Sequence, residues 1–275
     1  MSAPPDLYGV IGHPVSHSRS PQIHRLFASQ TGQNLDYVLL DAEPGEFVDV
    51  VTEFRDRGGR GLNVTVPFKE EAYAIATRCS QRARLAGAVN TLAWLDGELI
   101  GDNTDGTGLT RDLEANLGVR IEGASVLLVG AGGAARGVVA PLLDCGARRL
   151  VVANRTPERA TELVARFGSS PRLRSIALGD VGGPFDLVVN ATSASLKGQI
   201  PAIPAAAVGA TTFCYDMMYA TEPTAFLLWA RDHGAGGSAD GLGMLVEQAA
   251  ESFFLWRGIR PDTAAVLEQV RSSLD

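Results

Sequence analysis

The stretch SVLLVGAGGAARGVVAPLLDCG (125–146) constrains the fold more than any other part of the chain. It joins an almost wholly apolar run to a glycine-rich turn and then to a segment with helical periodicity, and the turn carries G-x-G-x-x-A at Gly130, Gly132 and Ala135. In such a unit the first glycine permits a tight turn, the second lets a phosphate approach the backbone, and a small third residue allows close helix–strand packing. We therefore predict a dinucleotide-binding α/β unit, with the pyrophosphate at the helix N-terminus.

The next apolar run, RLVVAN (149–154), ends where NAD-binding proteins usually place a carboxylate for the ribose hydroxyls. This chain has Asn154 there, followed by Arg155, and Arg159 lies one helical turn further on. Loss of the carboxylate removes repulsion toward a 2′-phosphate, and guanidinium groups bind that dianion with paired hydrogen bonds. Both arginines could instead be solvated surface residues, but two at this location favour NADP(H) over NAD(H).

Apolar runs alternate with helix-period segments along the rest of the chain, which predicts an α/β fold. Predicted strands cover 8–12, 36–41, 61–68, 125–130, 149–154, 185–192 and 211–217, and predicted helices cover 21–31, 44–57, 70–79, 106–117, 134–144 and 157–167. Two of these strands are apolar on both faces, as in a parallel sheet covered by helices. The length, 275 residues, is sufficient for two domains. Two further helical segments, 241–256 and 261–275, follow a glycine-rich loop, and their pattern leaves open which half they pack on.

Composition argues against several functional classes. The net charge is −7 and there is no basic stripe, so binding to nucleic acid or to an anionic membrane is not expected. No apolar run approaches the ~18 residues of a membrane span, and the first residues lack the basic and apolar segments of a secretory signal. Three widely spaced cysteines suggest reduced thiols in a cytoplasmic protein, and the four histidines show no zinc-ligand spacing, so no metal is expected.

The segment GLNVTVPFKEE (61–71) reads as a strand that delivers a cation at its end. Period-2 alternation puts its apolar residues, Val66 among them, on a core face. Asn63 and Thr65 point the other way, and Lys69 continues that polar row if the chain stays extended. Because a proline cannot donate to a ladder, pairing should stop before the lysine and open toward a cleft. A solvent-facing lysine is the common alternative.

HSRSPQIHRLFASQTG (17–32) predicts a helix with Ser20 at the N-cap, Pro21 at the first helical position and Gly32 past its end. Capping does not explain Ser18, and two hydroxyls beside a helix N-terminus would suit a small carboxylate ligand.

Two short turns, GAVNT (87–91) and GDNTDGTG (101–108), carry further polar side chains. Asx turns explain one such turn, but several together suggest a pocket for a polyhydroxylated ligand. The polar residues of these turns are Asn90, Asp102, Asn103, Thr104 and Asp105.

Taken together and in order, these blocks resemble the shikimate dehydrogenase family along nearly the whole chain. The matching blocks are GHPVSHSRSPQIH, NVTVPFKE, AGAVNT, GDNTDG, GAGGAARG, ANRT, NATS, YDMMY and DGLGMLVEQAA. The resemblance implies NADPH-dependent, reversible reduction of 3-dehydroshikimate to shikimate, on the route to aromatic amino acids. It also implies an open α/β substrate-binding domain (1–105 plus 241–275) and a Rossmann-type, doubly wound parallel-sheet domain that binds NADP (106–240), with the C-terminal helices returning to the first domain.

The resemblance further implies roles for single residues. Lys69 matches the catalytic lysine, and Asp105 matches a hydroxyl-binding position; we predict that Asp105 is also the catalytic partner of Lys69. Substrate-binding positions fall on Ser18, Ser20, Asn63, Thr65, Asn90, Tyr219 and Gln248. Cofactor-binding positions fall on Gly130, Ala131, Gly132, Gly133, Ala134, Asn154, Arg155, Thr156, Arg159, Thr192, Met217 and Gly241. One departure is Ser195, in a cofactor-side loop, where many relatives carry glycine.

Reduction of a ketone by hydride requires a proton at the oxygen, and a lysine held as an ammonium by a neighbouring carboxylate could supply it. The sequence does not decide whether Lys69 or Asp105 makes the transfer, and it leaves a monomer or a homodimer open. Alternatives are a relative that also oxidises quinate, and a catalytically silent NADPH-binding regulator. The intact serines and the Asn-Arg-Thr segment disfavour the first, and the intact Lys69 and Asp105 disfavour the second.

Overall fold

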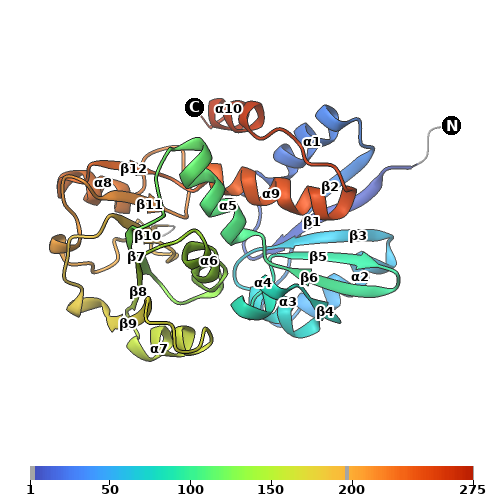
Figure 1. The fold of residues 1–275 in the computed structure, drawn as a ribbon. Coiled ribbons are helices and arrows are strands. Elements are labelled where there is room, and N and C mark those ends of the chain that lie inside the picture. Colours follow the sequence, from blue (N-terminus) through green and yellow to red (C-terminus); the bar gives the residue numbers. More distant parts are fainter. Residues whose placement is uncertain (1–3, 196–197, 275) are drawn as a thin grey trace. The chain divides into compact units, whose positions relative to one another are not determined.

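The computed structural model describes residues 4–195 and 198–274, which form two compact units (Figure 1). Unit 1 comprises the chain up to Gly108 together with Leu245–Ser273, and unit 2 comprises Leu109–Met244. The chain passes from unit 1 to unit 2 within α5 (Asp105–Arg111) and returns within α9 (Leu242–Arg257). In the described residues no helix is long and apolar enough to cross a membrane.

Unit 1 contains a mixed sheet of order β2-β1-β3-β5-β6-β4. Its first three strands in that order run parallel, whereas β5 is antiparallel to both β3 and β6. Short β4 pairs parallel to β6 at the edge. The strand bounds are β1 Asp6–Gly12, β2 Leu35–Asp41, β3 Gly59–Val64, β4 Arg78–Cys79, β5 Thr91–Leu95 and β6 Glu98–Asp102.

The C-terminal helices pack on unit 1, as the family resemblance implied. The indole of Trp256, in α9, donates from Nε1 to the Leu92 carbonyl at 3.0 Å and stacks on Tyr8 with ring centroids 4.7 Å apart. Helix α10 contacts α1 (Figure 1). The remaining helices of unit 1 are α1 Ser20–Thr31, α2 Phe47–Asp56, α3 Lys69–Ile75 and α4 Gln81–Ala86, and α10 spans Ala264–Ser272.

Unit 2 is a wholly parallel sheet of order β12-β11-β10-β7-β8-β9. Counted from β7, this is the doubly wound order 3-2-1-4-5-6 read from the other edge, with the reversal between β7 and β10. Alternate residues of β7 enter two different cores, Val126 and Leu128 on one face and Leu127 and Val129 on the other. The strands are β7 Ser125–Val129, β8 Arg149–Asn154, β9 Leu173–Ala177, β10 Leu187–Asn190, β11 Phe213–Asp216 and β12 Gly237–Ala239, and the helices are α6 Gly133–Asp144, α7 Pro157–Ala165 and α8 Ala225–Asp232.

Several predicted elements need correction. The strand predicted for 61–68 ends at Val64, and Val66 is 45% exposed rather than in the core, because the chain turns at this point. The helix predicted for 70–79 ends at Ile75, since its last two residues form β4. The helix predicted for 106–117 continues from α5 into a π-helical turn, Asp112–Asn116. Short elements that the pattern missed are β5, β6, β9, β12, α4 and α8.

Candidate active site and cofactor site

Lys69 is the first residue of α3 and does not continue a strand. The Phe68 amide donates to the Thr65 carbonyl at 3.0 Å, which closes a turn between β3 and the helix. Phe68 itself is fully buried and stacks on Phe47, with ring centroids 4.9 Å apart. The Lys69 carbonyl accepts a hydrogen bond from the Val89 amide at 2.8 Å. The backbone that carries the lysine is thus anchored on both sides.

The Lys69 ammonium pairs with the Asp105 carboxylate. Nζ lies 2.6 Å from Oδ2, and the two side chains are only 13% and 5% exposed. The other carboxylate oxygen, Oδ1, accepts a hydrogen bond from Asn90 Nδ2 at 2.9 Å. The structure therefore brings together the predicted lysine and aspartate, with a predicted substrate-binding residue beside them.

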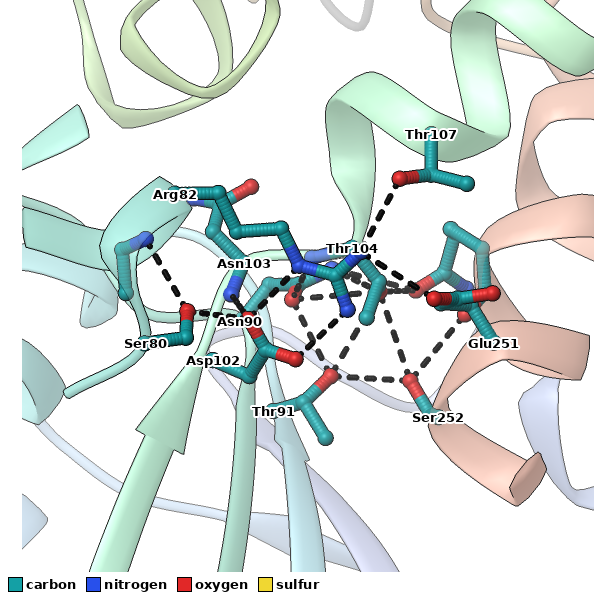
Figure 2. A network of polar contacts seen from close by, with 12 residues as sticks. Ser80, Arg82, Asn90, Thr91, Asp102, Asn103, Thr104, Thr107, Glu251 and Ser252 are labelled. Atoms are coloured by element: carbon teal, nitrogen blue, oxygen red, sulfur yellow. Dashed lines mark hydrogen bonds and ion pairs between the residues drawn. The ribbon is translucent and has the colours of Figure 1, made fainter. Parts of the chain in front are cut away.

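Asn90 is the centre of a buried polar network (Figure 2). Its Nδ2 also lies 2.9 Å from Thr104 Oγ1 and 3.2 Å from Gln248 Oε1, while its Oδ1 accepts the Thr104 backbone amide at 2.8 Å. The amide is thus oriented from both ends. Gln248, in α9, is held in turn by donation from Nε2 to the Leu245 carbonyl at 2.9 Å.

Asn63 belongs to the same network, although its strand position suggested only a polar face. Its Nδ2 donates to Ser252 Oγ at 2.8 Å and to Thr91 Oγ1 at 3.2 Å. The Tyr37 hydroxyl donates to its Oδ1 at 2.7 Å. Burial raises the pKa of Tyr37 well above its usual range, with the nearby Ser20 hydroxyl opposing the rise, so the phenol is a proton donor.

Ser18 and Ser20 lie together, but Ser20 is not the N-cap. Helix α1 begins at Ser20, with Arg19 before it in a helical conformation and no side-chain cap. Ser18 Oγ accepts the Ser20 backbone amide at 3.3 Å and donates to Ser20 Oγ at 3.2 Å. Thr65 lies close to Gly12, where an added Cβ would come within 2.3 Å of the threonine Cγ2.

His24 follows Ser20 by one turn of α1 and is wholly buried. Its ring stacks on Tyr37, with centroids 4.3 Å apart. Among the described residues neither ring nitrogen has a partner with hydrogen-bond geometry. Burial lowers the pKa of His24 to about 3, against a smaller opposing effect of the nearby Asn63 side chain. The imidazole is therefore neutral at physiological pH.

In unit 2 the glycine turn has the conformation that the motif predicts. Gly130 has φ +118, and an added Cβ would come within 3.1 Å of the Ala191 carbonyl oxygen. Gly132 precedes α6 with open space where a Cβ would lie, and no side chain caps this helix. Ala135 is fully buried against the core. A helix start without a side-chain cap and an open approach at Gly132 suit a phosphate.

The two arginines of the NADP prediction lie in the turn after β8 and in the first turn of α7. Asn154 Nδ2 donates to the Thr156 carbonyl at 2.9 Å, which closes the turn before α7. Arg155 lies in this turn and Arg159 in the first turn of α7, and both side chains are exposed. Both are thus accessible to a phosphate group from solvent.

Three further predicted cofactor residues, Thr192, Met217 and Gly241, follow the carboxyl ends of β10, β11 and β12. Thr192 donates from Oγ1 to Asn190 Oδ1 at 2.7 Å. Met217 follows β11, and Gly241 packs on it so closely that a Cβ would lie 2.3 Å from the Met217 carbonyl oxygen. Tyr219 lies two residues beyond Met217, in unit 2, whereas the other predicted substrate residues lie in unit 1. Ala131, Gly133 and Ala134 belong to the turn and the start of α6.

Ser195, the departure from the family pattern, binds a buried carboxylate. Its Oγ donates to Asp216 Oδ2 at 2.6 Å, as does Thr224 Oγ1. The other oxygen of Asp216 accepts the Met218 amide and Asn190 Nδ2, both at 3.1 Å. Burial raises the pKa of Asp216, and these hydrogen bonds oppose the rise. The serine thus connects the segment that follows β10 with the end of β11.

The sequence reasoning missed three residues that support the site in unit 1: Tyr37, Arg82 and Ser252. Each lies in a strand or helix whose local pattern is unremarkable, so no motif could single it out.

The two sites define the class of protein. One is a glycine turn on a doubly wound sheet, and the other is a buried lysine–aspartate pair among amides and hydroxyls. Together they define an NAD(P)-dependent oxidoreductase of the α/β class.

Three family models match the chain. They describe the shikimate dehydrogenase substrate binding domain (residues 10–92), shikimate / quinate 5-dehydrogenase (113–198) and the shikimate 5′-dehydrogenase C-terminal domain (241–271). A shikimate dehydrogenase (NADP(+)) of Hahella chejuensis is 55% identical over 97% of this chain and 98% of its own length. The chain therefore belongs to the shikimate dehydrogenase family.

Solved structures with the same fold support the family assignment. An Ael1 enzyme from Pseudomonas putida matches with a TM-score of 0.89 at 46% identity, over 96% of this chain and 97% of its own. Shikimate 5-dehydrogenase from Thermus thermophilus, crystallised in complex with NADP(H) and shikimate, matches with a TM-score of 0.87 at 35% identity, over 98% of this chain and 100% of its own. The predicted α/β class, with its Rossmann-type sheet, is confirmed.

Proposed function

We propose that this chain reduces 3-dehydroshikimate reversibly to shikimate with NADPH, in the biosynthesis of aromatic amino acids. The family supports the reaction, and one observation supports the chemistry: the Lys69 ammonium lies 2.6 Å from Asp105, with both side chains largely withdrawn from water. Negative charge develops on the oxygen of a ketone as it is reduced, and a positioned ammonium can stabilise that charge and supply the proton.

In this proposal Lys69 Nζ donates the proton to the ketone oxygen and takes it back in the oxidative direction. Within the described residues Nζ uses one of its three N–H donors on Asp105, which leaves donors for a substrate oxygen. Asp105 orients the ammonium, and Asn90 in turn holds the second Asp105 oxygen. Ser18 and Ser20 bind the substrate carboxylate, and Asn63, Thr65, Asn90 and Gln248 bind its hydroxyls. The family resemblance makes Tyr219 a further substrate-binding residue.

The residues of unit 2 fit NADP(H). The open space at Gly132 and the uncapped start of α6 suit the pyrophosphate, and Arg155 with Arg159 suit a 2′-phosphate. When bound, NADPH supplies the hydride. Met217 and Gly241 would lie near the nicotinamide, and Thr192 is a further cofactor-binding residue. We assign cofactor binding to the domain of residues 106–240 and substrate binding to 1–105 with 241–275.

We further propose that the enzyme acts in the cytoplasm, as a monomer or homodimer, on small molecules alone. Light scattering of the purified chain measures its mass in solution and separates a monomer of about 29.0 kDa from a dimer.

A single assay tests the proposed function. The purified chain is given shikimate or quinate, each with NADP⁺ or NAD⁺, and the near-ultraviolet absorbance of the reduced nicotinamide is followed. We expect shikimate with NADP⁺ to give the highest kcat/KM. Higher efficiency with quinate and NAD⁺ would change the assigned substrate and cofactor. If no combination of substrate and cofactor is turned over by a protein that still binds NADPH, the chain would instead be a catalytically silent NADPH-binding regulator.

A further inference from the structure

The mechanism above does not use Arg82. This residue, in α4, contacts side chains of β6, α5 and α9 near Asp105, the first residue of α5. Its Nε and Nη2 donate to the two carboxylate oxygens of Asp102, at the end of β6, at 2.7 and 2.5 Å. Its Nη1 donates to Thr107 Oγ1 in α5 and to Glu251 Oε1 in α9, both at 3.1 Å. Figure 2 shows the guanidinium between these three side chains.

The two carboxylates of this cluster are largely withdrawn from water, whereas the Arg82 side chain is 32% exposed, and the charges compensate one another. The side chains of Asp102 and Glu251 are 7% and 14% exposed. Burial raises the pKa of Asp102, but the hydrogen bonds and charge of Arg82 outweigh burial and lower it, with help from the Ser80 hydroxyl. Burial likewise lowers the pKa of Arg82, and its two acidic partners more than reverse this effect. Without the guanidinium, Asp102 would be a buried carboxylate without its bidentate cation, which destabilises the fold unless the group takes up a proton or moves toward water.

The residues that Arg82 contacts are linked, by hydrogen bonds or along a helix, to the residues around the proposed catalytic pair. The Asp102 carbonyl accepts a hydrogen bond from the Asn90 backbone amide at 3.0 Å, and Asp102 Oδ1 accepts one from the Asn103 backbone amide at 2.7 Å. Asn103 Oδ1 then accepts the Asp105 amide at 3.2 Å. Thr107 is in the same turn of α5 as Asp105, and Glu251 follows the substrate-site glutamine by one turn of α9.

Resting on the proposed function, we propose that Arg82 is a positioning residue: it sets the orientation of Asp105 and Gln248 without contacting the substrate. It does so by fixing the end of β6, the start of α5 and the middle of α9 relative to one another. A guanidinium suits this task because its planar fork binds a carboxylate at two points and still has a donor for a third partner.

The test compares Arg82→Gln and Arg82→Lys with Arg78→Gln, a control that removes the exposed ion pair of Arg78 with Glu98 from the same unit. For each variant kcat, both KM values and the thermal midpoint are measured, with kinetics well below the unfolding transition. We expect Arg82→Gln to lower kcat about 10- to 100-fold, because small misplacements of reacting groups cost that much. Arg82→Lys should lose less, KM for NADP⁺ should stay within about two-fold, and the control should match the wild type.

The double variant Arg82→Gln, Asp102→Asn separates positioning from stability. It removes the uncompensated buried charge, so the thermal midpoint should recover relative to Arg82→Gln, while kcat should stay low because the two-point contact is still missing. Recovery of kcat together with the midpoint would overturn the positioning role, as would kcat within about two-fold of the wild type in both single variants. If Arg82→Gln does not fold, the kcat of Arg82→Lys relative to the wild type becomes the test of the positioning role. A wild type that neither oxidises nor binds shikimate would overturn the proposed function as well, whereas an active wild type with unaffected variants would overturn this inference alone.

Discussion

At the scale of single residues, the side-chain amides of unit 1 are oriented by partners that act there as donors or as acceptors, but not as both. Asp105 only accepts hydrogen bonds when ionised, so Asn90 must turn its Nδ2 toward it, and its Oδ1 then faces the Thr104 amide. The Tyr37 hydroxyl likewise fixes the Asn63 amide by donating to Oδ1. A ligand that enters this site meets donors and acceptors that are already arranged.

Lys69→Met should lower kcat for shikimate oxidation about 10²- to 10⁴-fold, the usual contribution of general acid–base catalysis. KM for shikimate should change much less, because the lost contact matters most in the transition state. Steady-state kinetics with NADP⁺ measures both quantities. Glu71→Gln, an exposed residue in the same helix, serves as the control. Turnover near the wild-type rate in Lys69→Met would remove the lysine from the chemistry.

Arg155→Ala should weaken NADPH binding about 10-fold or more, since a charge-assisted contact to the 2′-phosphate is lost. NADH, which lacks that phosphate, should bind as before. Fluorescence titration with each nucleotide gives the two dissociation constants. Arg174→Ala, an exposed arginine on β9, should affect neither. Equal losses for NADPH and NADH would contradict the phosphate role.

At the scale of elements, the parallel sheet of unit 2 gathers its proposed cofactor residues at one edge, because each of them follows the carboxyl end of a strand. Two of the strand ends are joined by buried contacts. Asp216 binds Ser195, which follows β10, and Met218, which follows β11. Gly241, after β12, lies against the Met217 backbone.

Gly241→Ala should displace the segment after β11. The new Cβ would lie 2.3 Å from the Met217 carbonyl oxygen and 2.6 Å from its carbon, and a backbone cannot yield as a flexible side chain can. We expect a loss of about 1–3 kcal/mol in stability, as for other overpacked sites, together with weaker NADPH binding. Thermal denaturation and nucleotide titration measure the two effects. The matched control is Gly179→Ala, where the Cβ meets open space. If both variants bind and unfold alike, the close packing has no such role.

At the scale of the whole molecule, each unit has buried hydrophobic clusters of its own, and acid should weaken unit 1 through His24. This side chain is neutral in the fold, with its pKa lowered by burial from 6.5 to about 3. Between these values the unfolded chain binds a proton that the folded chain does not, so stability falls as the pH falls.

For the wild type, the contribution of His24 to the free energy of unfolding should decline by about 1.4 kcal/mol per pH unit between pH 6.5 and about 3. His24→Phe removes the titrating group and should flatten the pH dependence in this window. Urea denaturation at several pH values, followed by circular dichroism, gives the slopes. His233→Phe, a change at an exposed histidine, should leave the wild-type slope. An unchanged slope in His24→Phe would mean that other groups carry the acid sensitivity.

The sequence alone determined the features that depend on local periodicity and backbone conformation. The strand–turn–helix at 125–146 could be read because the positive φ of Gly130 and the apolar β7 are properties of neighbouring residues. The strand at 149–154 was placed correctly for the same reason. The family resemblance also named Lys69 and Asp105 together, but the residues by themselves did not say that they touch.

Only the tertiary structure decided which distant side chains meet. Lys69 and Asp105 are 36 residues apart, and they pair because β3, β5 and β6 lie side by side in one sheet. Val66 shows the limit of a local pattern, since its alternation predicted the core but the chain had already turned into the loop before α3. Arg82 and Glu251 lie 169 residues apart and meet only because α9 returns to unit 1. Such contacts follow from strand pairing and helix packing, which no short stretch of sequence encodes.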